Sequence, residues 1–257
     1  MREDMNYGNQ IADYEDVKSC INEFLELYEK RPIENNAGGM SSSHLFWTWY
    51  VLKKLNPKNI IESGVWKGQG TWIMRQACPD AKIFSIDPVL KNRVYVDKCV
   101  TYFREDFSKI EWENILNPKE TLCFFDDHQN AYERLQQMKW MGFSCAMFED
   151  NYPVLQGDCY SLKKIFSQRE YMIDGLGEKK MYPPVKAHLE YVKKNTESYT
   201  TFPPLFKKDV TRWGDYWDDE NYPTPKAIFG EEDKENYPIL EQEAGGYTWI
   251  CYIKLKD

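Results

Sequence analysis

The 257-residue sequence has no apolar run long enough to cross a membrane, no CxxC cysteine pair and no N-glycosylation sequon. A membrane-spanning helix needs about 20 consecutive apolar residues, so we expect no membrane segment. The seven cysteines are scattered and odd in number, which favours reduced thiols over a disulfide framework or a zinc site. The first residues, Met1 to Asp4, are charged rather than apolar, so a secretory signal is not expected. These features predict a cytoplasmic protein.

An excess of positive charge is also absent. The sequence holds 33 basic and 41 acidic residues, for a net charge of −8. This balance argues against a nucleic-acid partner or binding to an anionic membrane surface. Residues 209–243 contain eleven acidic and three basic residues, so this stretch accounts for the whole net charge. Acidic runs of this kind usually form a solvated surface.

Two helices are predicted before the main part of the chain. Apolar residues recur at helical spacing from Tyr14 to Glu29, and Pro32 follows. After the polar loop 34–43, a second helix is expected from His44 to Leu55, with a serine as its cap.

From residue 59 onward, short apolar strands alternate with helices. Strands are predicted at 59–64, 82–86, 100–103, 121–125 and 144–148, and helices at 71–78, 92–98 and 130–141. This alternation is typical of βαβ units, and therefore predicts an α/β fold with a mostly parallel sheet.

The alternation stops after residue 151. A helix is plausible at 159–166, and 247–255 reads as a final strand. The stretch between them is too long for an ordinary loop, so we expect a lid. The interpretation is one domain in four parts: N-terminal helices at 1–58, a ligand-binding core at 59–155, an aromatic, acidic lid insertion at 156–245 and a last strand at 246–257.

Polar groups follow four of the predicted strands at the points where they end. The sequences there read ESG at 62–64, Asp87, DDH at 126–128 and EDN at 149–151. In open α/β sheets, ligands bind at the carboxyl ends of the strands. Acids also end strands because turns favour them, but their recurrence at four ends favours a ligand site.

The first strand leads into a glycine-bearing turn, ESGVWKGQGTW at 62–72. Its spacing is G-x-x-x-G-x-G, which is neither the dinucleotide fingerprint G-x-G-x-x-G nor a P-loop. Glycines allow the backbone to approach a ligand closely. Asp87, which ends the next strand, is positioned to accept hydrogen bonds from ribose hydroxyls.

This turn, followed by a strand that ends in IDP, resembles motif I and the acidic loop of class I S-adenosylmethionine-dependent methyltransferases. The E-x-G-V-W-x-G form is similar to the macrocin O-methyltransferase family, whose members methylate sugar hydroxyls. The resemblance covers roughly 45–155 and the last strand. It implies a Rossmann-like class I methyltransferase sheet and S-adenosyl-L-methionine as cofactor. The cofactor-binding residues that it implies are Glu62, Gly64, Gly68, Asp87, Asp106 and Phe107.

The family also holds a magnesium ion with acids that follow the fourth and fifth strands. The matching positions are Asp127, Glu149 and Asp150, so the resemblance implies Mg²⁺ or Mn²⁺ at these residues. Two departures stand out. Glu149 replaces an aspartate of the family pattern, although glutamate is still a hard oxygen ligand. The FFDDHQ sequence leaves open whether Asp126 or Asp127 is the ligand.

Methylation of a sugar hydroxyl needs a base, and we expect Asp127 and His128 to be the catalytic residues. A divalent cation lowers the pKa of a bound hydroxyl, and His128 is the best candidate to take its proton. A structural role for His128 stays open. His44 could line the cofactor mouth, although capping or packing is the simpler interpretation, and no role is assigned to His188.

The lid contains the sequence WGDYWDDENYPTP at 213–225. Aromatic faces stack on the apolar faces of sugar rings, so we expect Trp213, Tyr216 and Trp217 to bind the acceptor. The same aromatic residues could instead form the packing core of the lid.

The hypothesis is therefore a metal-assisted O-methyltransferase that acts on a sugar or glycan, with a homo-oligomer as a possible state. Three alternatives remain at this point. They are a nicotinamide-dependent oxidoreductase, a non-catalytic methyltransferase-like module that binds a glycan or a protein, and a metal-dependent enzyme for a small phenol.

Overall fold

We analysed a computed structural model of the chain, which describes residues 6–8, 10–167, 171–173, 179–181 and 185–257. The charged first residues 1–4 lie outside this range. The helices are α1 (Tyr14–Tyr28), α2 (Ser42–Leu55), α3 (Gln69–Ala77), α4 (Ala131–Met141), α5 (Leu162–Phe166), α6 (Val185–Asn195) and α7 (Pro238–Gln242). The strands are β1 (Asn6–Tyr7), β2 (Asn59–Ser63), β3 (Lys82–Ile86), β4 (Val100–Phe103), β5 (Thr121–Phe125), β6 (Cys145–Phe148), β7 (Tyr171–Ile173), β8 (Lys179–Met181), β9 (Thr196–Thr201) and β10 (Cys251–Leu255).

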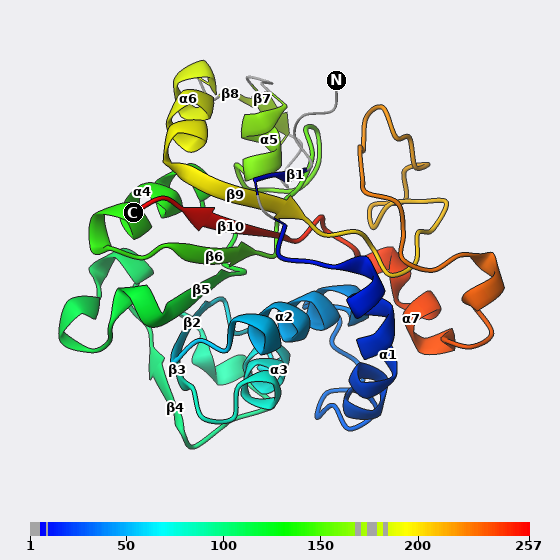
Figure 1. Ribbon diagram of the computed structural model, residues 1–257, viewed down its shortest axis with the longest axis horizontal. Coiled ribbons are helices and arrows are strands. Elements are labelled where there is room, and N and C mark those ends of the chain that lie inside the picture. The colour runs from blue at the N-terminus through cyan, green and yellow to red at the C-terminus, as the bar shows by residue number, and fades with distance from the viewer. Residues whose placement is uncertain (1–5, 9, 168–170, 174–178, 182–184) are drawn as a thin grey trace.

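Eight of these strands form one twisted sheet, in the order β1-β9-β10-β6-β5-β2-β3-β4 (Figure 1). The strands β2 to β6 run parallel, and β10 is antiparallel to both β6 and β9. This arrangement confirms the predicted α/β class with a mostly parallel, Rossmann-like sheet. The chain turns from one side of β2 to the other between β4 and β5, so a topological switch point lies between β2 and β5.

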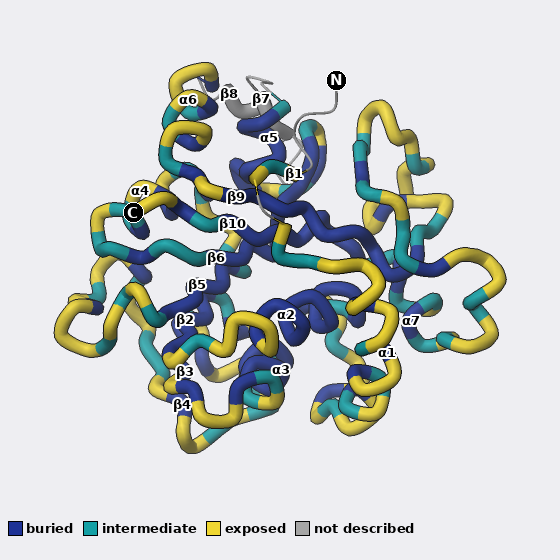
Figure 2. The backbone as a smooth tube through the Cα atoms, in the orientation of Figure 1, coloured by how far each residue is buried: buried dark blue, intermediate teal, exposed yellow. Residues whose placement is uncertain are grey.

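Each face of the sheet has its own hydrophobic core, because neighbouring residues of a strand point to opposite faces. Ile60 belongs to the core under α1, α2 and α3, whereas Ile61 belongs to the core under α4, α5 and α6. The helix α2 is buried along most of its length, as the dark blue tube in Figure 2 shows. The sheet is therefore covered by helices on both faces, and its carboxyl edge remains for ligands.

Most predicted elements are confirmed to within a few residues, but two expectations are wrong. Residues 92–98 do not form a helix: a single 3₁₀ turn ends at Asn92, and the chain then turns to β4. The expected lid at 156–245 also contains β9, which pairs with β10 in the main sheet. The strand was missed because its sequence, TESYTT, has no apolar run.

The seven cysteines are all free, as predicted. Within the described part of the chain, none of the helices has the length and apolar character needed to cross a bilayer.

Candidate active site

A cavity of about 320 Å³ lies at the carboxyl ends of the parallel strands, at the switch point. Its walls come from the ends of β2, β3 and β5, from the loop after β4 and from α4. The lining residues are Ser63, Gly64, Ile86, Asp87, Pro88, Arg104, Glu105, Asp106, Asp126, Asp127, His128, Gln129 and Arg134. The four polar strand ends that the sequence singles out thus meet around the carboxyl edge of one sheet.

The glycine turn after β2 forms the floor of this cavity. Gly64 has a φ of +98°, and a Cβ atom there would lie only 1.9 Å from the carbonyl oxygen of Asp126. Gly68 has a φ of +94°, and its Cβ would lie 2.5 Å from the carbonyl oxygen of Tyr95. Only glycine fits both positions, because the left-handed conformation and the close approach exclude a side chain.

Asp87 holds this turn in place. Its Oδ2 accepts hydrogen bonds from the amides of Val65 (3.0 Å) and Trp66 (3.1 Å), and its Oδ1 accepts one from Val89 (2.7 Å). The carboxylate also lines the cavity, so a ligand hydroxyl there would share oxygens that already accept backbone N–H groups.

Glu62 is buried beneath the glycine turn. Its Oε2 accepts hydrogen bonds from the hydroxyls of Thr71 (2.5 Å) and Ser85 (2.6 Å), while its Oε1 is buried without a hydrogen-bond partner among the described residues. Burial raises the pKa of Glu62 to about 7, despite those two hydrogen bonds. Buried polar atoms are normally paired, but Glu62 itself does not line the cavity.

Asp106 lines the cavity, whereas its neighbour Phe107 does not. Asp106 is held by Arg134, with Oδ2 2.7 Å from Nη2, and this hydrogen bond drives the pKa of the carboxyl well below its ordinary value. Phe107 is fully buried, and it packs edge-on against Phe125 with ring centroids 5.2 Å apart. The ring of Phe107 thus belongs to the hydrophobic core, and its expected contact with a cofactor ring stays a prediction.

Asp126, rather than Asp127, joins the acids that follow β6. Ligand atoms of Asp126, His128 and Asp150 lie within 4.8 Å of one another and could hold a metal ion. Asp127 instead accepts hydrogen bonds from Ser63 (2.7 Å) and Arg134 (2.8 Å) through Oδ2. The geometry thus favours Asp126 over Asp127 as the metal ligand, because Ser63 and Arg134 already engage Asp127. The catalytic role of Asp127 stays a prediction.

The donor set of this cluster fits a hard divalent cation. Burial and the nearby Asp150 raise the pKa of Asp126 well above its ordinary value, as expected for carboxylates that lack a compensating charge. Oδ2 of Asp150 is buried, and Nδ1 of His128 lies 3.2 Å from it. Two carboxylates and an imidazole suit Mg²⁺ or Mn²⁺.

Glu149 lies beside the cluster rather than within it. Its Oε1 is 3.1 Å from Nδ1 of the buried His44. Burial, Asp150 and Asp126 raise the pKa of Glu149. Burial lowers the pKa of His44 to about 3, so this imidazole is neutral. The expected metal role of Glu149 therefore stays a prediction, and His44 is a packed, hydrogen-bonded residue whose Nε2 accepts the amide of Thr248 at 2.9 Å.

His128 stands at the mouth of the cavity with a left-handed backbone, at φ +53°. Its Nδ1 lies 3.0 Å from Asp158 Oδ1 and 3.2 Å from Asp150 Oδ2. The hydrogen bond to Asp158 and the neighbouring acids raise the pKa of His128 to about 9, so the imidazole is protonated at neutral pH in this arrangement. Asp158 has no sequence signal, because it lies in the loop after β6, far from any recognised motif.

The three lid aromatics differ in their surroundings. Trp217 stacks on the buried Trp249 (5.3 Å between centroids), and Trp213 packs edge-on against Tyr152 (5.2 Å). Tyr216 is 84% exposed. Two of the predicted acceptor-binding residues therefore also pack the lid, and neither role excludes the other. His188, to which no role was assigned, stacks on Tyr132.

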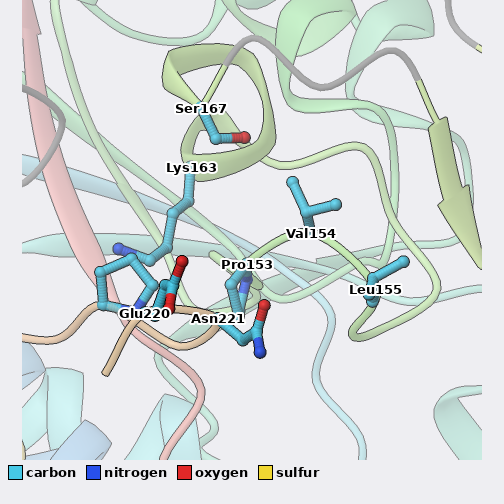
Figure 3. A pocket seen from close by; sticks show the side chains of 8 residues that line it. Pro153, Val154, Leu155, Lys163, Ser167, Glu220 and Asn221 are labelled. Atoms are coloured by element: carbon cyan, nitrogen blue, oxygen red, sulfur yellow. The ribbon is translucent and has the colours of Figure 1, made fainter. Parts of the chain in front are cut away.

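A smaller hollow lies where the acidic segment meets the loop after β6 (Figure 3). Pro153, Val154 and Leu155 face Glu220 and Asn221 across it, with Lys163 from α5 above. Its volume of about 60 Å³ is too small for a cofactor or a sugar.

No family model and no curated protein matches this chain. Several solved structures are similar to it. One is SAH-bound cmcI-N160, which is 15% identical over 44% of this chain and 62% of that chain, with a TM-score of 0.37. Another is the Mg-SAM complex of cmcI-D160, which is 17% identical over 69% of this chain and 76% of that chain, with a TM-score of 0.40. A third is the SAH-bound Podospora anserina methyltransferase PaMTH1, which is 12% identical over 98% of this chain and 100% of that chain, with a TM-score of 0.43. The chain thus spans less than two thirds of the SAH-bound cmcI-N160 chain. These similarities are too distant to assign an activity, a substrate or a metal.

Proposed function

We propose that the chain is an S-adenosylmethionine-dependent O-methyltransferase that acts on a hydroxyl of a sugar or glycan with the help of a divalent cation. One observation carries the proposal: a single cavity joins Gly64 and Asp87, where the motif I resemblance puts the cofactor, to Asp126 and His128, where a cation and an acceptor would meet.

Different residues around this cavity would bind the cofactor and the cation. The glycine turn gives the cofactor close access to the backbone, and the carboxylate of Asp87 provides an acceptor in the cavity. Glu62, buried behind the turn, would act on the cofactor from outside the cavity wall. Asp126 and Asp150 would hold the cation, with His128 beside them. When bound, the cofactor supplies an electrophilic methyl group, and the cation lowers the pKa of the acceptor hydroxyl.

The acceptor hydroxyl must lose a proton as its oxygen attacks the methyl carbon and the carbon–sulfur bond breaks. His128 is our candidate to receive it, because Asp158 engages Nδ1 and leaves Nε2 for the acceptor. Asp126 and Asp150 are among the acids that raise the pKa of His128, and they are also the residues that would hold the cation. A bound cation would offset their negative charge and therefore favour the neutral imidazole.

A methyl-transfer assay tests the proposal. The full chain is incubated with S-adenosylmethionine and Mg²⁺ against free hexoses, nucleotide sugars and catechol, and formation of S-adenosylhomocysteine is measured. We expect turnover with a sugar, loss in EDTA and recovery with Mn²⁺. Asp150→Asn should lose most activity and still bind S-adenosylhomocysteine, because the cofactor contacts come from other strands.

The other outcomes identify the alternatives. Turnover of catechol alone would indicate a phenolic acceptor, and thermal stabilisation by NAD but not by S-adenosylhomocysteine would indicate an oxidoreductase. Full activity in EDTA, with His128→Ala inactive, would show that the base works without a metal. Sugar binding with no turnover of any acceptor would indicate a non-catalytic module.

A further inference from the structure

A second cavity, of about 500 Å³, lies between the loop 34–41 and the segment 242–246, and Arg212 of the lid completes its wall. The loop is attached to the glycine turn, because the indole of Trp66 donates to the carbonyl of Ala37 (3.2 Å) and Lys67 donates to that of Asn35 (3.0 Å). The cavity therefore borders the proposed cofactor site.

Polar atoms without partners concentrate around this cavity. Four buried side-chain atoms that lack a hydrogen-bond partner among the described residues lie in the single segment 31–42: Arg31 Nε, Asn36 Oδ1, Ser41 Oγ and Ser42 Oγ. Asn36 and Ser41 line the cavity directly, and Ser42 is fully buried beside it. Buried polar groups are normally satisfied, so this concentration indicates a place for a polar ligand.

Arg212 is the positively charged side chain among the residues named as lining this cavity. Among the residues that the structure describes, no carboxylate lies within ion-pair distance of its guanidinium, whose one side-chain hydrogen bond is 3.4 Å long, to the hydroxyl of Tyr152. Arg212 is exposed, so its charge is accessible to a ligand. Because Tyr152 lies two residues after Asp150, this hydrogen bond connects the wall of the cavity to the loop after β6.

The acids that line the cavity do not cancel this charge. Glu243 is engaged elsewhere: its Oε2 accepts hydrogen bonds from the hydroxyl of Tyr28 (2.6 Å) and the amide of Ser42 (2.9 Å), and its Oε1 lies 3.9 Å from Arg31. Glu34 is an exposed residue of the loop. A ligand that pairs with Arg212 must therefore bring its own negative charge.

We propose that this cavity is the acceptor subsite and that the acceptor carries an anionic group, a carboxylate or a phosphate, which binds Arg212. The hydroxyl of Ser41 and the side-chain amide of Asn36 then bind hydroxyls of the same molecule, and the hydroxyl to be methylated points toward Glu149 and Asp150. The inference rests on the proposed function, since an acceptor subsite exists only beside a methyl donor.

Calorimetric titration of the full chain, saturated with S-adenosylhomocysteine, tests this inference. The probes are glucuronate, glucose 1-phosphate and neutral glucose. The two anions should bind at least about tenfold more tightly than glucose, as expected for a charge-assisted hydrogen bond. Arg212→Gln should abolish that preference, and the matched control Lys226→Gln, another exposed cation of the lid, should keep it.

Three results would overturn the inference. The first is equal binding of the anions and glucose, and the second is no binding of any of the three. The third is a loss of about tenfold in S-adenosylhomocysteine affinity in Arg212→Gln with the sugar preference unchanged, which would assign the anion site to the amino-acid end of the cofactor. A wild-type chain that binds no S-adenosylhomocysteine would refute the proposed function itself, together with this subsite.

Discussion

The guanidinium of Arg134 holds the carboxylate of Asp127, with Nη2 2.8 Å from Oδ2. The same guanidinium pairs with Asp106 at 2.7 Å, so one buried arginine is shared by two acids of the cavity wall. This pairing separates the adjacent acids after β5, because Asp127 has a permanent partner whereas Asp126 faces Asp150 and His128.

This separation predicts opposite results for two matched variants. Asp126→Asn should weaken Mn²⁺ binding by more than roughly tenfold, because it removes a charged ligand. Asp127→Asn should keep the Mn²⁺ affinity and lower the free energy of unfolding. Electron paramagnetic resonance of free Mn²⁺ measures the first effect and urea denaturation the second. The account is wrong here if Asp127→Asn is the variant that loses Mn²⁺.

Arg134 should be important for stability. Arg134→Met leaves Asp127 and Asp106 without their partner, so it should lower the free energy of unfolding by about 2–3 kcal/mol. The loss is smaller than for a deeply buried pair, because Asp106 is partly exposed. Urea denaturation checks this. Lys58→Met, which breaks an exposed pair with Glu120, is the control and should change stability by less than about 0.5 kcal/mol. Equal effects of the two substitutions would contradict the account.

Glu62 should make stability depend on pH. Its pKa in the folded protein is raised to about 7 from an ordinary 4.5, so between these values the native state keeps a proton that the unfolded chain has lost. The stability that this proton provides is complete below about pH 4.5 and is lost as the pH rises to about 7. Relative to Glu62→Gln, the wild type should lose about 3 kcal/mol between pH 4.5 and pH 8. Parallel urea curves for the two proteins across this range would refute the assignment.

The lid aromatics should separate into packing and surface residues. Trp217→Ala removes the stacking partner of the buried Trp249, so it should cost about 2–4 kcal/mol of stability. Tyr216 is 84% exposed, and Tyr216→Ala should stay within about 0.5 kcal/mol of the wild type. Thermal unfolding measures both. If Tyr216→Ala also leaves the Michaelis constant for the acceptor unchanged, Tyr216 has no part in acceptor binding.

The parallel core of the fold was predictable because its strands are continuous apolar runs between turn residues. The bounds of β3, β4 and β5 are the predicted ones. The strand β9 was not predicted, because its sequence has no apolar run and it lies in a proline-rich stretch. Its pairing with β10 and β1 places it in the sheet. The false helix at 92–98 failed because Val94 and Val96 stay exposed, with no core to cover.

The site was predictable at the level of strand ends but not of individual side chains. Successive residues after a strand point in different directions, so the sequence could not decide between Asp126 and Asp127. The deciding partner, Arg134, lies on the next helix, and Asp158 and Arg212 come from distant loops. The available sequence signal for the pairing of Asp127 was Arg134, an arginine in the first turn of the helix that follows. The sequence could not show that Phe107 is buried in the core, because an aromatic residue beside an acid fits a ring platform and a core position equally well.

The central claim is that the cavity between the glycine turn and Asp87 binds S-adenosylmethionine. The most direct test is calorimetric titration with S-adenosylhomocysteine on the wild type and Asp87→Ala, with NAD as the competing ligand. We predict that the wild type binds one S-adenosylhomocysteine per chain and gives no heat with NAD. Asp87→Ala should lose about 2 kcal/mol or more of the binding free energy, because charge-assisted hydrogen bonds to the ribose are removed and the glycine turn loses its hydrogen bonds to Asp87. Binding of NAD in place of S-adenosylhomocysteine, or an unchanged affinity in a folded Asp87→Ala variant, would contradict it.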